Sequence, residues 1–86
     1  MKEIIFSKHS ETQMLLRGAD KEEVTKTIND GLKETAKFNK FHSTLTFEFK
    51  SNSPVNNKYY EFKTLDVIFV EENNQIIVVT VKVCYH

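Results

Sequence analysis

The hydrophobic pattern of this chain changes its period near residue 32, and that change is the strongest constraint on its fold. Before it, apolar residues recur every three or four positions, as on one face of an α-helix. After it, apolar and polar residues alternate, and β-branched and aromatic residues dominate, as in half-buried strands. The sequence therefore predicts an α+β domain in which two N-terminal helices pack on a mainly antiparallel sheet of about four to five strands.

A short strand and a helix are predicted at the N-terminus. Lys2–Phe6 can form the strand, and the helix follows over about Ser7–Arg17. Ser7 or Ser10 offers an N-cap, because a serine hydroxyl accepts hydrogen bonds from the free N–H groups of a first turn. Gly18 supplies the end of the helix.

A second helix is predicted directly afterwards and runs to about Asp30. Asp20 has the position of an N-cap and Glu23 that of its capping-box partner. Gly31 is placed to take the left-handed conformation that often ends a helix. The buried stripe of this helix is expected to consist of residues four apart, namely Val24, Ile28 and Leu32.

The remainder of the chain is predicted to be sheet. Thr44–Lys50 alternates cleanly, and Ser51–Lys58, with a proline and three asparagines, is the expected loop. Tyr59–Val70 is the next strand, and Glu72–Gln75 is a tight-turn sequence because Asn tolerates positive φ. Ile76–Tyr85 is then the last strand.

Two of these strands carry finer predictions. Asp66 shares a side with Tyr60 and Phe62, so a bulge or bend is expected near Thr64. One face of the last strand is wholly apolar, which predicts a central strand with that face on the core. Its members are Ile77, Val79, Val81, Val83 and Tyr85.

Composition limits the domain organisation and the site chemistry. The 86 residues fit one domain, 1–86, and contain no apolar run long enough to span a bilayer and no signal peptide, so a cytoplasmic protein is expected. A lone Cys84 fits a reducing compartment. No cysteine or histidine pair has metal-ligand spacing, so neither a metal nor another cofactor is expected. The net charge is zero, so a nucleic-acid partner would require charges that are segregated on the surface.

Candidate site residues come from the first helix and the last strand. His9 and Arg17, the only arginine, lie about 12 Å apart along the first helix, and Arg17 can reach back toward His9. Thr80, Lys82 and His86 share one face of the last strand by parity. Ordinary surface and helix-end roles remain open for each of them.

The first third of the chain resembles a known family. Residues 6–18 read FSKHSETQMLLRG, followed by KEEV at 21–24 and INDG at 28–31, and the last strand contains VVTV at 78–81. This order is similar to the opening and close of domain-of-unknown-function family 4258. The resemblance implies a RelE-like fold, shared with barnase, EndoU and colicin-type ribonucleases, and a bacterial toxin–antitoxin setting. His9 and Arg17 match the polar helix positions of that family, and Thr80 matches its strand position. The neutral composition departs from the basic character of RelE-like toxins.

The resulting hypothesis is a toxin-like, metal-independent endoribonuclease. In it the ribose 2′-hydroxyl attacks the adjacent phosphate, with His9 or His86 as base or acid. Arg17 and Lys82 stabilise the phosphorane, and Thr80 orients a phosphate oxygen. Further RNA contacts are assigned to three residues, Lys8, Gln13 and Tyr85.

A non-catalytic interaction module is the alternative. It would be an antitoxin-like or immunity-like partner, a homodimer, or a family member that has lost its activity. Its sequence support is a surplus of aromatic residues that could form an exposed patch: Phe38, Phe41, Phe47, Tyr59 and Tyr60. A cavity shared by His9, Arg17 and Thr80 would favour catalysis, whereas a flat aromatic patch would favour binding.

Overall fold

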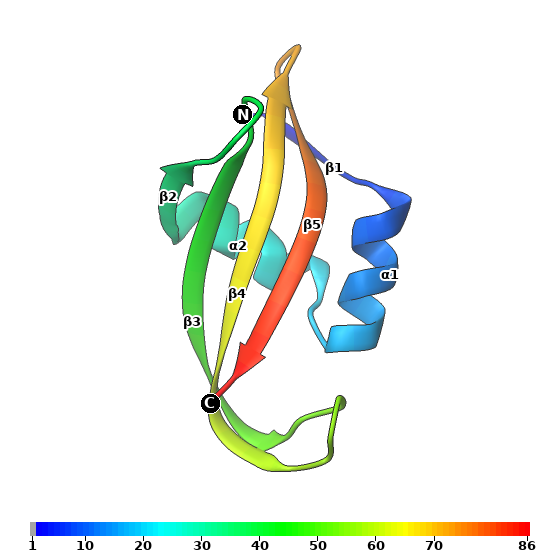
Figure 1. Ribbon diagram of the computed structural model, residues 1–86, viewed down its shortest axis with the longest axis vertical. Helices are drawn as coiled ribbons and strands as arrows, with labels where there is room; N and C mark the ends of the chain where they lie inside the picture. Colours follow the sequence, from blue (N-terminus) through cyan, green and yellow to red (C-terminus); the bar gives the residue numbers. More distant parts are fainter. Residues whose placement is uncertain (1) are drawn as a thin grey trace.

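The computed structural model describes residues 2–86, which form two helices and a five-stranded sheet (Figure 1). The elements follow in chain order as β1 (Glu3–Phe6), α1 (Lys8–Arg17), α2 (Lys21–Asp30), β2 (Leu32–Thr35), β3 (Phe41–Asn52), β4 (Tyr59–Glu72) and β5 (Gln75–Tyr85). The predicted α+β class and the N-terminal position of the helices are confirmed.

The strand order is β1-β5-β4-β3-β2, and β1 pairs with β5 in parallel. The sheet is therefore mixed, and the prediction of a mainly antiparallel sheet is wrong. The first four residues of β5 pair with β1, and α1 then runs beside the rest of β5 in the same direction (Figure 1). Because β1 runs parallel to β5, the helix that follows β1 continues in the direction of β5. α1 therefore covers the part of the β5 edge that does not pair with β1.

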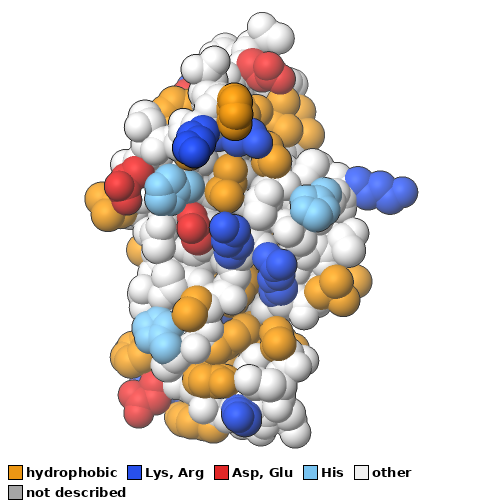
Figure 2. Space-filling model, in the orientation of Figure 1, with side chains coloured by type: hydrophobic (Ala, Val, Ile, Leu, Met, Phe, Trp, Pro, Cys, Tyr) orange, Lys and Arg blue, Asp and Glu red, His pale blue; other side chains and the backbone are white. Residues whose placement is uncertain are grey.

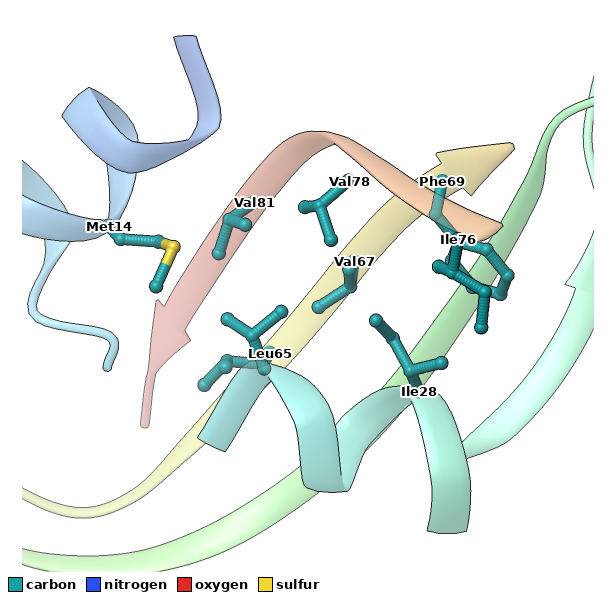
Figure 3. Packing of buried hydrophobic residues seen from close by; sticks show 9 residues of the cluster. Met14, Ile28, Leu65, Val67, Phe69, Ile76, Val78 and Val81 are labelled. Atoms are coloured by element: carbon teal, nitrogen blue, oxygen red, sulfur yellow. The ribbon is translucent and has the colours of Figure 1, made fainter. Parts of the chain in front are cut away.

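Both helices lie on one side of the sheet, and the core fills the space between the helices and the sheet (Figures 1 and 3). Met14 reaches from α1 toward β5, and Ile28 of α2 lies over β4 (Figure 3). The buried apolar cluster consists of Met14, Val24, Ile28, Leu65, Val67, Phe69, Ile76, Val78 and Val81. These side chains supply most of the apolar burial that stabilises the fold.

The start and end of α1 are fixed by local chemistry. Ser7 is the N-cap, and its hydroxyl accepts a hydrogen bond from Ser10 N at 3.1 Å. Ser10 is buried instead of capping, with its hydroxyl donating to Ser7 O at 2.8 Å. Gly18 ends α1 with a φ of 80°, as predicted.

The predicted capping box of α2 is confirmed, but two predictions for its end are wrong. Asp20 and Glu23 cap each other's backbone N–H groups. Gly31 has an extended backbone, with φ −77°, and glycine is required there because a Cβ would meet Thr27 O and Ser43 Oγ. Leu32 is exposed, because the chain leaves the helix at Asp30 and enters β2.

The bulges match the sequence prediction only in part. Thr64 itself pairs regularly on both sides, but the register shifts close to it, where Phe62 and Tyr60 pair with Glu48 and Ser51. On β5, Thr80 pairs with Ile68 but Val78 pairs with Phe69, which leaves Val79 as the extra residue of a bulge.

The bulge at Val79 also corrects the predicted inner face of the last strand. On the N-terminal side of the bulge the even-numbered residues Ile76 and Val78 are buried, whereas on its C-terminal side the odd-numbered Val81 is buried. One inserted residue exchanges the two faces of a strand, so the predicted parity holds only beyond Val79.

Candidate active site

The helices leave one side of the sheet uncovered, and we call it the open face (Figures 1 and 2). Its side chains form rows across β3, β4 and β5, because residues directly opposite on antiparallel strands point to the same side. The register gives the rows His42–Ile68–Thr80, Thr44–Asp66–Lys82 and Thr46–Thr64–Cys84, and a last row of Glu48 and Phe62 beside His86. Most of these side chains are polar, in contrast to the apolar side under the helices.

A histidine and a carboxylate meet in the first two rows. His42 Nδ1 lies 3.2 Å from Asp66 Oδ1, and their side chains are 30% and 35% exposed. Lys82 stands opposite Asp66 on β5, and Thr80 completes the row of His42. An imidazole, a carboxylate, an ammonium group and a hydroxyl therefore share one accessible part of the sheet.

A second polar group lies at the other end of the open face. Thr64 Oγ1 is 2.8 Å from Thr46 Oγ1 and 2.8 Å from His86 Nε2. The ring of Phe62 stacks on the His86 ring with centroids 5.8 Å apart. His86 is thus held by a hydroxyl and an aromatic ring, with part of the Phe62 ring exposed.

The side chains of Gln13 and Arg17 bind backbone groups at the edge of β5. Gln13 Oε1 accepts a hydrogen bond from Val81 N at 2.9 Å, and Arg17 Nη1 donates one to Val81 O at 2.8 Å. The two side chains thereby satisfy both backbone groups of Val81, which face away from β4. The sequence predicted a catalytic role for Arg17 and an RNA contact for Gln13, whereas in the structure both side chains join α1 to β5.

Tyr85 belongs to the same junction. Its hydroxyl donates to Arg17 O, and its ring packs against Phe49 and Tyr60 with centroids 5.0 and 5.8 Å away. Burial raises the pKa of the Tyr85 phenol, and the negative charge of Glu23 adds to the shift. The phenol is therefore neutral at physiological pH and serves as a hydrogen-bond donor.

The remaining predicted residues of α1 lie in its first turn. His9 and Lys8 are both exposed there. Three hollows within residues 2–86 lie elsewhere: one of about 460 Å³ runs along α2, one of about 480 Å³ lies beside the turn that follows β2, and one of about 410 Å³ lies between β1 and α2. None of these three is lined by His9, Arg17 or Thr80.

The aromatic surplus does not form one exposed patch. Phe41 and Phe47 pack against the core, and Tyr60 lies against Tyr85. Only Phe38 and Tyr59 of the five are largely exposed, at 86% and 60%.

No group of three or more His, Cys, Asp or Glu side chains that could hold a metal ion occurs within residues 2–86. In the same part of the chain, neither helix has the length and apolar character needed to cross a membrane.

The structure adds two candidate residues, His42 and Asp66, that the sequence did not indicate as site residues. Strand parity could have indicated both. β3 begins at Phe41, earlier than predicted, so His42 lies on the same side of the strand as Thr44 and Thr46. Asp66 lies on the regular polar side of β4.

Comparisons with family models, curated proteins and solved structures find no match for this chain. The structure itself shows an α+β domain whose mixed sheet has a polar open face.

Proposed function

We propose that this protein is a metal-independent endoribonuclease of the RelE-like kind, with its reaction centre on the open face. The observation that carries the proposal is the contact between His42 and Asp66 at 3.2 Å, with Lys82 opposite the carboxylate. The resemblance of residues 5–31 to domain-of-unknown-function family 4258 suggests the same class of enzyme, but the residues that carry it lie outside the open face. Single-stranded RNA fits this surface, because an unpaired strand can lay its phosphates and bases along an open sheet.

His42 is suited to act as the general base. When its Nδ1–H donates to Asp66, Nε2 carries the free lone pair and can accept the proton of a ribose 2′-hydroxyl. The 2′-oxygen then forms a bond to phosphorus and the bond from phosphorus to the 5′-oxygen breaks. The products are a 2′,3′-cyclic phosphate and a 5′-hydroxyl, and Asp66 stabilises the imidazolium that forms.

Lys82 and Thr80 are suited to handle the phosphate. The Lys82 ammonium stabilises the extra negative charge of the phosphorane, and it or a water molecule that it holds protonates the departing 5′-oxygen. The Thr80 hydroxyl, in the row of His42, can orient a phosphate oxygen.

His86 takes a binding role in this proposal. It lies four residues beyond Lys82 along β5, which is about 13 Å and too far for proton transfer at the same phosphate. With Phe62 stacked on it, His86 offers a platform for a base. Arg17 and Gln13 act as positioning residues, since they hold α1 against β5 next to Thr80 and Lys82.

Cleavage of a labelled single-stranded oligonucleotide in the presence of a chelator tests the proposal. We expect 2′,3′-cyclic phosphate ends, and His42→Ala should lower the rate by about 10² to 10⁴. Lys82→Gln should also be slow, whereas Lys26→Gln on the exposed face of α2 serves as the matched control with normal rates. If His9→Ala abolishes cleavage and His42→Ala does not, the reaction centre lies on α1 and the assignment to the open face is wrong.

A protein-binding module is the second candidate, and one observation favours it. Leu15 and Leu16 are adjacent on α1 and 84% and 68% exposed. An antitoxin-like partner or a second copy of the chain could cover them. Sedimentation of the wild type and of Leu16→Gln tests the second copy, because a dimer that uses this surface should dissociate in the variant.

A further inference from the structure

The connection between β2 and β3 is a tight turn with an unusual residue in it. Phe38 and Asn39 both have positive φ, 60° and 59°, and Lys40 N donates to Lys37 O at 3.3 Å. Two consecutive central residues with positive φ are the pattern of a type I′ turn, which favours Asn, Asp or Gly. A bulky aromatic residue in the left-handed region is strained.

The turn between β4 and β5 shows what this chain uses when only a tight turn is needed. There the two positive-φ positions are Asn73 and Asn74, at 50° and 65°. In the turn between β2 and β3, Phe38 occupies the first of the two positions, and it is 86% exposed. Phe38 therefore contributes neither favourable turn geometry nor core burial, and an interaction outside the chain would explain it.

Basic residues adjoin Phe38 and Asn39 in the sequence. Lys37 and Lys40 flank the two central residues, and residues 36–46 contain these lysines and His42 but no acidic residue. Two acidic side chains lie on other strands near the turn. Glu34 stands opposite His42 on β2, and Glu71 binds Lys2 and Lys33 at 2.7 and 2.8 Å while lining the hollow beside the turn.

We propose that the turn Lys37–Lys40 is a second contact site for single-stranded RNA. A base stacks on the Phe38 ring, and Lys37 and Lys40 neutralise the phosphates on either side. Because Lys40 is two residues from His42, about 7 Å along the chain, a strand bound at the open face continues onto the turn. This proposal rests on RNA as the substrate and extends the proposed function from a reaction centre to a binding path.

Fluorescence anisotropy with a labelled single-stranded oligonucleotide and a duplex of the same sequence tests it. Phe38→Asn should weaken single-strand binding about tenfold, since stacking of a base is lost. The same variant should raise the melting temperature by about 4 °C, because the strain at φ 60° is relieved. Phe38→Trp should keep the affinity. Val55→Asn removes an exposed apolar side chain from the loop between β3 and β4 and should change neither quantity.

The salt dependence separates the lysines from the ring. Lys37→Gln should reduce the slope of log affinity against log salt by about 0.7, the value for one phosphate of a single strand. Phe38→Asn should leave that slope unchanged.

Each result separates this inference from the proposed function. If Phe38→Asn and wild type bind single strands equally, the inference is overturned even when His42→Ala abolishes cleavage. Equal losses for single strand and duplex would also overturn it, because paired bases cannot stack on the ring. If wild type cleaves no RNA but Phe38→Asn still weakens binding selectively, the binding site stands and the catalytic proposal fails.

Discussion

Lys63 shows how an ordinary-looking charge becomes structural once the chain is folded. Its ammonium group donates to Gly18 O at 2.9 Å and pairs with Glu23 at 2.8 Å, and the residue is only 6% exposed. The pair connects β4 to the junction of the two helices. A buried charge of this kind requires its partners, because desolvation without them would cost several kcal/mol, on the order of 3 to 5.

Glu71 gives a prediction for the dependence of stability on pH. Hydrogen bonds from Lys2 and then Lys33 hold the pKa of Glu71 below its ordinary value of 4.5. A carboxylate with a lowered folded pKa adds stability above 4.5, and that stability is lost as the pH falls through the folded value. Urea unfolding from pH 6 down to pH 3 should therefore show a decline that is shallower in Glu71→Gln. An identical decline in the variant would contradict this role, and Glu72→Gln, an exposed neighbour, is the control.

At the scale of elements, α1 replaces a missing strand. β1 pairs with β5 only as far as Val78, so the later residues of β5 have backbone groups that face no strand on that side. Gln13 and Arg17 satisfy those of Val81, and Tyr85 bonds back to the end of α1. A helix thus protects part of an edge that would otherwise be open to pairing with another chain.

The loss of this protection should be measurable. Gln13→Ala leaves the Val81 N–H without its partner, which should cost about 1 to 2 kcal/mol in the free energy of unfolding. Amide exchange at Val81 should accelerate together with that loss. Gln75→Ala is the matched control, because Gln75 bonds an exposed Glu3 side chain and its removal should cost less than about 0.5 kcal/mol. Equal effects of the two substitutions would show that α1 does not stabilise the edge.

At the scale of the molecule, one side of the sheet carries the stability and the other carries the polar chemistry. Every fully buried apolar side chain of β4 lies under the helices, whereas the intervening residues Thr64, Asp66 and Ile68 are partly exposed. The two sides are independent enough that polar substitutions on the open face should leave the core intact.

Native-state hydrogen exchange should map this asymmetry. Amides of Leu65, Val67 and Phe69 should exchange only by global unfolding, because these residues are at most 1% exposed. β2 is exposed at all four positions and should exchange through local opening at much lower free energy. Equal protection of β2 and β4 would mean that the sheet opens as one unit. His42→Ala should leave the protection of β4 unchanged, which also validates it as a catalytic test.

The local predictions succeeded where neighbouring residues decide the structure. The period change near residue 32, the capping box of Asp20 and Glu23, and the glycine stop at Gly18 all depend on groups a few residues apart. The tight turn at Asn73 and Asn74 was predicted for the same reason.

Distant partners decided the rest. The parallel pairing of β1 with β5 joins residues more than 70 positions apart in the chain. The bulge at Val79 depends on the pairing of β5 with β4, about 10 positions away. Neither feature has a local signature in the sequence. Pairing with distant residues also explains why the predicted site residues lie in two places. Thr80, Lys82 and His86 share the open face, whereas Gln13, Arg17 and Tyr85 join α1 to β5.

The helices, the turns and the alternation of the strands were readable from the amino-acid sequence, because they follow from the chemistry of adjacent residues. The contact of His42 with Asp66 and the binding of Arg17 to backbone became visible only in the folded chain, because strand register and layer order bring together residues that are distant in the sequence.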